Sequence, residues 1–166
     1  MTTDKIYLVG FMGAGKSSVA RALAARLDWR AEDIDEWIER RERRDIPAIF
    51  RQHGEPYFRE LERETLVRML PLRGAVVASG GGTFVDPRNR ELMLRDGLVI
   101  WLDIPLATVL ERVPADGRRP LAADRAEFER LYLVRRAAYE QAHLRIDAGR
   151  VSVPAIIEQL VDWLEA

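Results

Sequence analysis

Cysteine is absent from the sequence, and its absence excludes several kinds of chemistry. The chain cannot build a disulfide framework, a thiolate nucleophile, an iron–sulfur cluster or a cysteine-ligated zinc site. Long apolar runs are also missing, since none approaches the roughly 20 residues that a membrane-spanning helix requires. The first residues lack the basic segment of a secretory signal. We therefore expect a cytoplasmic protein without a membrane partner, folded as one domain over residues 1–166.

Lysine is almost absent as well. The 26 basic residues comprise 24 arginines and two lysines, Lys5 and Lys16, and 27 acidic residues balance them to a net charge of -1. Such a balance disfavours a nucleic-acid partner, because nucleic-acid binding relies on a net basic field. The densest basic cluster, at residues 40–44, is interrupted and flanked by acidic residues, which is typical of a solvated helix face.

Short apolar stretches alternate with helical patterns along the chain. Strands are predicted at residues 5–10, 31–33, 75–78, 98–102 and 144–147. Helices are predicted at residues 15–27, 34–43, 46–52, 55–70, 87–96, 105–113, 125–141 and 153–164. This alternation predicts an α/β fold whose parallel sheet is covered by helices on both faces. Ligands of such folds bind at the carboxyl ends of the strands, where glycine-rich segments are found here.

The first glycine-rich segment, GFMGAGKS at residues 10–17, matches the phosphate-binding pattern GxxxxGK[ST] between a strand and a helix. The glycines let backbone N–H groups point at phosphate oxygens beside a helix N-terminus. Lys16 would reach the β- and γ-phosphates, and the Ser17 hydroxyl would face Mg²⁺. A simple glycine turn would explain the glycines but not the Lys-Ser pair in register. The pattern therefore predicts nucleotide binding.

The remaining sequence narrows the class of nucleotide-binding protein. Two lysines cannot supply the NKxD motif with which GTPases recognise guanine. The strand at residues 75–78 ends in SGGG, without the metal-binding acid common in larger motor and transport ATPases. The chain length and the arginine-rich loop at residues 114–120 favour a kinase of small metabolites or nucleotides, with this loop as a lid.

Residues 33–62 hold candidates for the acceptor site. Asp33 and Asp35 could divide their roles between the metal shell and an acceptor hydroxyl, although Asp35 could instead cap a helix. Arg59 could clamp a carboxylate through two parallel N–H···O hydrogen bonds, oriented by Glu62 three residues on. An ion pair on the protein surface is the alternative for these two residues.

Taken together, six ordered motifs resemble those of shikimate kinases over nearly the whole chain. They are GxxGxGKS, DxD, GExxFRxxE, SGGG, RPL and a late RxxxY. The resemblance implies transfer of the γ-phosphoryl group of ATP, with Mg²⁺, to the 3-hydroxyl of shikimate. It also implies a three-layer P-loop fold similar to nucleoside monophosphate kinases. Its five-stranded parallel sheet would have the order 2-3-1-4-5, and a lid would span residues 114–124.

The resemblance further implies how the nucleotide and metal are held. The ATP phosphates would contact the loop residues Gly13, Ala14, Gly15, Lys16, Ser17 and Ser18. Arg112 would stack on adenine, Pro154 would lie in the adenine loop, and Arg119 of the lid would reach the transferring phosphate. Ser17 would bind Mg²⁺ directly, with Asp33 and Ser79 acting through water.

For the acceptor, the resemblance implies that Asp35 holds the hydroxyl, that Arg59 and Arg135 bind the carboxylate, and that the Gly81 N–H contacts the ring. Asp35, Lys16 and Arg119 would form the catalytic set. Spacing to Tyr139 favours Arg135 over its neighbour Arg136. The chain departs from the common family pattern at Arg44-Asp45, Ala122 and Ala137, and none of these is a ligand.

Two other functions remain open at this point. A gluconate kinase-like enzyme of the same fold would also use arginines to bind an acidic substrate, although DxD, FR and SGGG favour shikimate. A nucleotide-binding regulatory module without turnover would be expected to lose one of Lys16, Ser17, Asp35 or Arg119, and all four are present. We expect a monomer.

Overall fold

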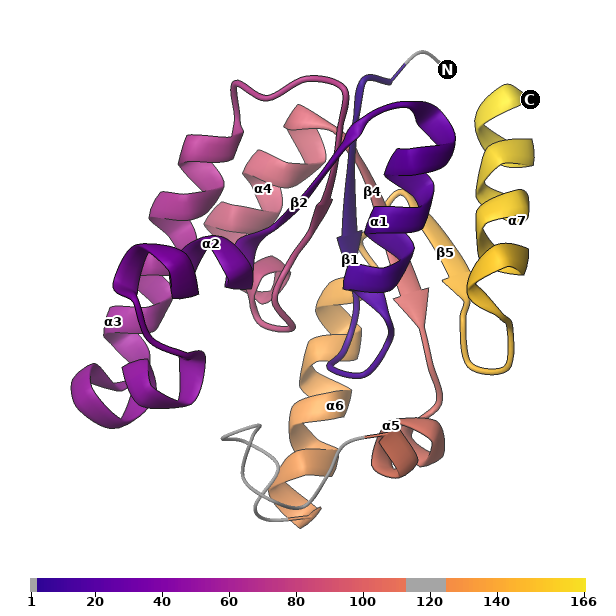
Figure 1. Cartoon of the computed structure of the whole chain (residues 1–166). Helices are drawn as coiled ribbons and strands as arrows, with labels where there is room; N and C mark the ends of the chain where they lie inside the picture. The colour runs from indigo at the N-terminus through magenta and orange to yellow at the C-terminus, as the bar shows by residue number, and fades with distance from the viewer. Residues whose placement is uncertain (1–2, 113–124) are drawn as a thin grey trace.

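The computed structural model describes residues 3–112 and 125–166, and they are built around one parallel sheet (Figure 1). Its strands are β1 (Lys5–Val9), β2 (Arg30–Asp33), β3 (Ala75–Ala78), β4 (Leu98–Asp103) and β5 (Leu144–Asp147). Their order is β2-β3-β1-β4-β5, and every neighbouring pair is parallel. This confirms the predicted order and the three-layer α/β architecture.

Helices follow the strands and cover both faces of the sheet. They are α1 (Lys16–Leu27), α2 (Ile34–Glu42), α3 (Ile46–Met69), α4 (Pro87–Asp96), α5 (Leu106–Arg112), α6 (Arg125–Tyr139) and α7 (Val153–Glu165). Helices α1 and α7 pack side by side against one face, while α4 contacts the other (Figure 1). Among the described residues, no helix is both long and apolar enough to cross a membrane.

The central strands are buried on both faces, which explains their continuous apolar runs. All residues of β1, β3 and β4 are buried, whereas the edge strand β2 has the polar sequence RAED and is partly exposed. Helix α3 bends at Gly54, whose φ of 82° and ψ of 172° are not helical, as the predicted break there required. The bend sets the course of the second half of α3, which carries Arg59 and Glu62.

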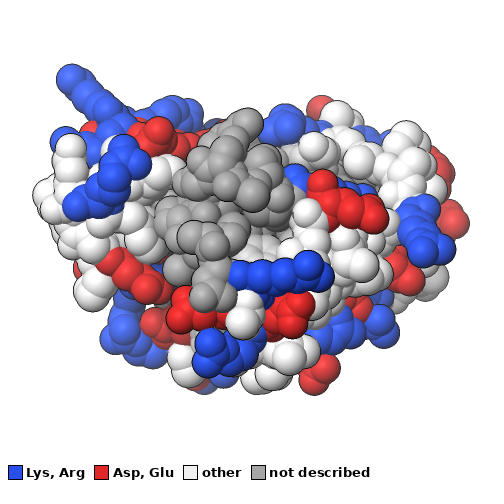
Figure 2. Space-filling view, turned by 90° about the horizontal axis from the view of Figure 1, so that it is seen from below, with Lys and Arg blue, Asp and Glu red and all other residues white. Residues whose placement is uncertain are grey.

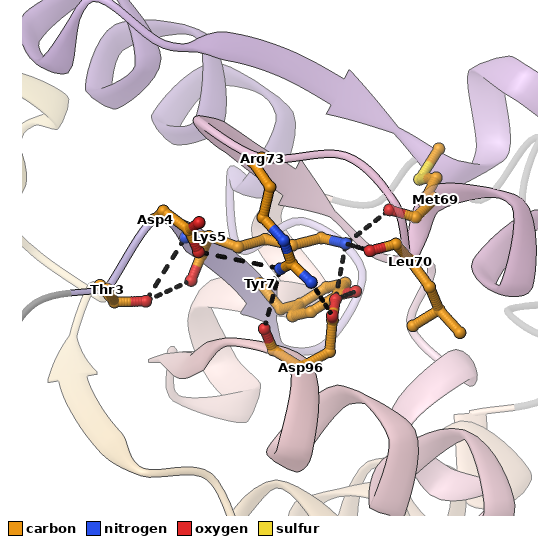
Figure 3. Close-up of polar contacts among 8 residues, drawn as sticks. All are labelled: Thr3, Asp4, Lys5, Tyr7, Met69, Leu70, Arg73 and Asp96. Atoms are coloured by element: carbon orange, nitrogen blue, oxygen red, sulfur yellow. Dashed lines mark hydrogen bonds and ion pairs between the residues drawn. The ribbon is translucent and has the colours of Figure 1, made fainter.

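A buried ionic cluster lies at the amino end of the sheet (Figure 3). Lys5 of β1 is fully buried, and its Nζ donates to the carbonyl oxygens of Met69 and Leu70 and pairs with Asp96 Oδ2 at 2.6 Å. The Tyr7 hydroxyl donates to the same carboxylate oxygen. The ammonium group therefore has three acceptors, two of them carbonyls at the C-terminal end of α3, where a positive charge is favourable.

Candidate active site

Two adjoining cavities open at the carboxyl ends of the strands, opposite the Lys5 cluster. The larger, of about 520 Å³, is lined by the phosphate-binding loop together with Asp33, Asp35 and Ser79. The smaller, of about 90 Å³, is lined by Arg59, Glu62, Arg135 and neighbouring apolar side chains. Four residues line both cavities: Met12, Asp35, Gly80 and Gly81. The site therefore has a polar compartment and an arginine-lined compartment with a common wall.

The phosphate-binding loop joins β1 to α1 and curls around the mouth of the larger cavity. Gly13 and Gly15 have φ angles of 81° and 85°, in the left-handed region that favours glycine. Lys16 Nζ donates to the carbonyl oxygens of Gly10, at 2.6 Å, and Phe11, at 2.9 Å, which holds the ammonium group over the loop. The loop amides and the N-terminus of α1 thus form the predicted anion-binding concavity.

Oxygen atoms suited to Mg²⁺ gather beside this loop. Ser17 Oγ donates to Asp33 Oδ2 at 2.6 Å, and Ser79, whose hydroxyl donates to the Leu8 carbonyl, lines the same cavity. Hydroxyl and carboxylate oxygens fit a hard cation that keeps several of its waters. Asp33 also caps α2 by accepting from the Glu36 N–H. The cap of this helix is thus Asp33 and not Asp35, which corrects the alternative considered for Asp35 from the sequence.

Asp35 lies in the first turn of α2, at the wall between the two cavities. Its Oδ1 is fully covered, and no described residue donates a hydrogen bond to it. Burial raises the pKa of Asp35 to about 7, and the negative charges of Asp33 and Glu62 add to the shift, while Lys16 opposes it. A covered carboxylate with an elevated pKa at a cavity wall is typical of a functional group.

Arg59 and Glu62 form an ion pair inside the smaller cavity. The Arg59 Nη1 donates to Glu62 Oε1 at 3.0 Å, and Glu62 is only 1% exposed, so this is not a surface pair. The Thr83 hydroxyl donates to the other oxygen, Oε2, at 2.8 Å. Burial opposes protonation of Arg59, but Glu62 and Glu55 outweigh it and raise the pKa of Arg59. Sequence reasoning missed Thr83, because nothing in its spacing predicts a contact with Glu62.

Arg135 and Arg136 of α6 point to different environments. Arg135 is 6% exposed, lines the smaller cavity and lies over the Phe11 ring, and no described acidic side chain pairs with it. Burial lowers the pKa of Arg135. Arg136 instead donates to both carboxylate oxygens of Asp103, at 2.6 Å and 3.2 Å. The structure thus directs Arg135, and not Arg136, into the cavity.

The other residues predicted to bind the nucleotide differ in whether they line the larger cavity. Gly13, Gly15, Ser17 and Ser18 line the larger cavity, whereas Ala14 is buried beneath it. Arg112 at the end of α5 also lines this cavity and donates to the Gly13 carbonyl. Pro154 lies exposed in the first turn of α7 and lines neither cavity. Arg119 and the predicted lid at residues 114–124 lie outside the described residues.

Figure 2 shows the molecule from below the view of Figure 1, which is the side toward which β1 points. Basic and acidic side chains are interspersed over the visible face. Inside the cavities, basic and acidic side chains also lie together, and Lys16, Arg59 and Arg135 are basic groups there that could contact an anionic ligand.

Comparisons with known proteins agree with these features. A sequence model of the family described as shikimate kinase matches residues 12–165. The shikimate kinase of Persephonella marina is 45% identical over 157 residues, covering 94% of this chain and 96% of that protein. The solved shikimate kinase from Acinetobacter baumannii in complex with shikimate has a TM-score of 0.93 at 33% identity, covering 99% of this chain and 94% of that chain. The shikimate kinase structure from Aquifex aeolicus has a TM-score of 0.88 at 32% identity, covering 97% and 96%. The chain therefore belongs to the shikimate kinase family.

Proposed function

We propose that the two cavities hold the two substrates of a phosphoryl transfer, with ATP along the phosphate-binding loop and shikimate between Arg59 and Arg135. As a member of its family, the chain is a kinase that uses ATP to phosphorylate shikimate. The observation that carries the assignment of the sites is the position of Asp35, which lines both cavities. A group in this wall can contact an acceptor hydroxyl on one side while the donor phosphate lies on the other.

The acceptor cavity suits a small carboxylic acid. No acidic side chain in the described part of the chain pairs with the buried Arg135 guanidinium, which is costly, and a substrate carboxylate would neutralise it. Arg59, whose Nη1 donates to Glu62 and whose Nε and Nη2 donate to the exposed Glu55, would donate to the same carboxylate through its remaining N–H groups. These two contacts, with the Gly81 N–H against the ring, would fix the far end of shikimate and aim its 3-hydroxyl at Asp35.

Asp35 would act on the acceptor hydroxyl as orienter and base. Its carboxylate accepts a hydrogen bond from the hydroxyl and takes its proton as the oxygen bonds to the γ-phosphorus and the bond to the β,γ-bridging oxygen breaks. A base whose pKa is about 7 is well matched to proton transfer near neutral pH.

The donor cavity supplies charge stabilisation. Lys16 and the loop amides would neutralise the β- and γ-phosphates, and Arg119 would join them from the lid. Ser17 would hold Mg²⁺ directly, with Asp33 and Ser79 contacting its waters. When bound, the ion would neutralise developing charge on the phosphate oxygens. We also propose that the enzyme is cytoplasmic and that it works as a monomer; the second proposal is supported by the lining of both cavities by one chain.

A coupled assay of ADP release tests this proposal against its alternatives. We expect turnover with shikimate and little with gluconate or nucleoside monophosphates. Asp35→Ala should lower kcat by about 10²-fold or more, whereas Glu60→Ala, which removes an exposed acid of α3, should not. Preferred turnover of gluconate would favour the related sugar-acid kinase. ATP binding without turnover of any acid would favour the regulatory module.

A further inference from the structure

The three glycines after β3 do not owe their identity to backbone conformation. Gly80, Gly81 and Gly82 are absent from the glycines with positive φ, and Gly82 has φ −100° and ψ −10°, which any residue adopts. They differ in this respect from Gly13 and Gly15 of the phosphate-binding loop. The reason for glycine at residues 80–82 must therefore lie in the space around each Cα atom.

That space is occupied by polar atoms of the acceptor site. A Cβ atom at Gly80 would lie 2.9 Å from Asp35 Oδ1 and 3.1 Å from Glu62 Oε2. A Cβ atom at Gly81 would lie 2.7 Å from Arg135 Nη1. Each glycine thus makes room for the functional end of a different side chain.

Gly82 completes the pattern. A Cβ atom there would overlap the Arg59 guanidinium, with Cζ and Nη2 both at 2.8 Å. The three consecutive residues therefore face three different groups: the carboxylate of Asp35, the guanidinium of Arg135 and the guanidinium of Arg59.

We propose that Gly80, Gly81 and Gly82 are positioning residues, each of which lets one acceptor-binding side chain reach its working position. The inference rests on the proposed roles of Asp35, Arg59 and Arg135. Because the clashing atoms are the ends of flexible side chains, an alanine would be accommodated by moving those atoms rather than the backbone. Substrate binding and catalysis would therefore suffer before stability does.

Gly97 offers a matched contrast at the other end of the sheet. It is also free of backbone constraint, with φ −161° and ψ −173°, and a Cβ atom there would lie 2.8 Å from the Lys5 carbonyl oxygen. This neighbour is backbone of a central strand and cannot move cheaply. Gly97→Ala should therefore lower stability without touching the acceptor site.

The first test compares Gly80→Ala, Gly82→Ala and Gly97→Ala by thermal melting, steady-state kinetics and calorimetric titration with shikimate. Gly82→Ala should raise the KM and Kd for shikimate by roughly 10-fold or more, as expected for loss of a charge-assisted hydrogen bond. Its KM for ATP should not change. Gly80→Ala should lower kcat by roughly 10²-fold, because the base is displaced. Gly97→Ala should lower Tm and leave both KM values unchanged.

The second test is a double-mutant cycle of Gly82→Ala with Arg59→Ala. If Gly82 acts through Arg59, the substitution should add nothing to the KM for shikimate once the guanidinium has been removed. Additive effects would overturn the proposal, as would Gly82→Ala with normal shikimate affinity or with a loss of folding that persists in the double variant. Failure of the proposed function would look different, because the unmodified enzyme would then not phosphorylate shikimate at all.

Discussion

The two lysines of the chain lie at opposite edges of the sheet, Lys5 at the start of β1 and Lys16 at the start of α1, and have opposite surroundings. Lys5, at the amino end, is fully buried, and protein oxygen atoms surround its ammonium group (Figure 3). Lys16, at the carboxyl end, contacts two carbonyls of its own loop and lines an open cavity of about 520 Å³. Lysine therefore stabilises the fold from a buried position at one end of the sheet and lines a candidate ligand site at the other.

The difference extends to the charges around each lysine. At the amino end, burial opposes ionisation of Asp96, but hydrogen bonds from Lys5 and Tyr7 outweigh it and lower the pKa of Asp96. At the carboxyl end, burial raises the pKa of Asp35, and no described acid pairs with the buried Arg135. Charges are compensated within the protein at the amino end, whereas at the carboxyl end Asp35 Oδ1 accepts no hydrogen bond and Arg135 has no acidic partner among the described residues, at a cost to stability.

The largest effect should come from removing the buried charge at the amino end. Lys5→Met leaves the Met69 and Leu70 carbonyls without the ammonium donor and removes the buried cation from the Asp96 carboxylate, which keeps only Tyr7 and the half-exposed Arg73 as donors among the described residues. We expect a loss of about 3–5 kcal/mol of unfolding free energy, or a fall in Tm of roughly 10 °C for a domain of this size. Circular dichroism melting measures this. The control is Arg73→Ala, which removes an Asp96 partner that is 51% exposed and should cost less than about 1 kcal/mol. Equal melting temperatures for the two variants would show that Lys5 contributes no more to stability than the exposed Arg73 does.

Replacing the other lysine with methionine, at the carboxyl end, should affect activity more than stability. Lys16→Met removes charge stabilisation of the transferring phosphate, and we expect kcat to fall by roughly 10²–10³-fold, with a smaller change in Tm than Lys5→Met causes. Lys16→Arg should recover little activity, because a planar guanidinium does not replace a compact ammonium group. A Lys16→Met enzyme with normal turnover but a greatly lowered Tm would contradict the assignment of Lys16 to catalysis and of Lys5 to stability.

The pKa of Asp35 predicts how the carboxyl end responds to pH. The ionised form accepts the hydrogen bond of the acceptor hydroxyl, so kcat/KM for shikimate should fall about tenfold per unit as pH drops below about 7. The folded-state pKa is raised above the unfolded value. Ionised Asp35 therefore destabilises the fold increasingly as pH rises from about 4 to 7, and this cost levels off above 7.

Asp35→Asn should remove this cost along with the activity. We expect it to stabilise the protein at pH 8 by on the order of 4 kcal/mol, the equivalent of a pKa raised from 3.8 to about 7, and by less at pH 5. Melting both proteins at the two pH values measures the difference. A difference in Tm that does not vary with pH would show that Asp35 does not carry the shifted pKa.

Much of the fold could be predicted from the sequence because its signals are local. Apolar runs and helical periodicity predict β1, β3 and β4 to within one residue of their observed bounds, and the phosphate-binding loop depends on residues adjacent in the chain. The helix break at Gly54 is local in the same way. The choice of Arg135 over Arg136 came from the RxxxY motif of the family that the chain resembles, which is also a pattern of residues close in the chain.

The remaining features depend on contacts between distant segments. The three acceptors of Lys5 come from α3 and α4, so its role is invisible in the sequence around it. The Asp33 cap could not be separated from Asp35 by pattern, since either aspartate precedes a helical residue. The steric reason for the glycines at residues 80–82 requires knowing where α2, α3 and α6 place their side chains.

The smallest predicted effect concerns Thr83. It tests whether a buried hydroxyl at the carboxyl end positions side chains for substrate binding and does not mainly stabilise the fold. Thr83→Val keeps the side-chain shape but removes the hydroxyl that donates to Glu62 Oε2 at 2.8 Å. Glu62 would then be free to turn away from Arg59, and we expect the KM for shikimate to rise about fivefold, equivalent to about 1 kcal/mol, with kcat and the KM for ATP unchanged. The matched control is Thr65→Val, because Thr65 is equally buried on α3 but donates to the Leu61 carbonyl within its own helix. Thr65→Val should lower Tm slightly and leave the KM for shikimate unchanged. If both variants shift only Tm, the Thr83 hydroxyl stabilises the fold and does not position Arg59.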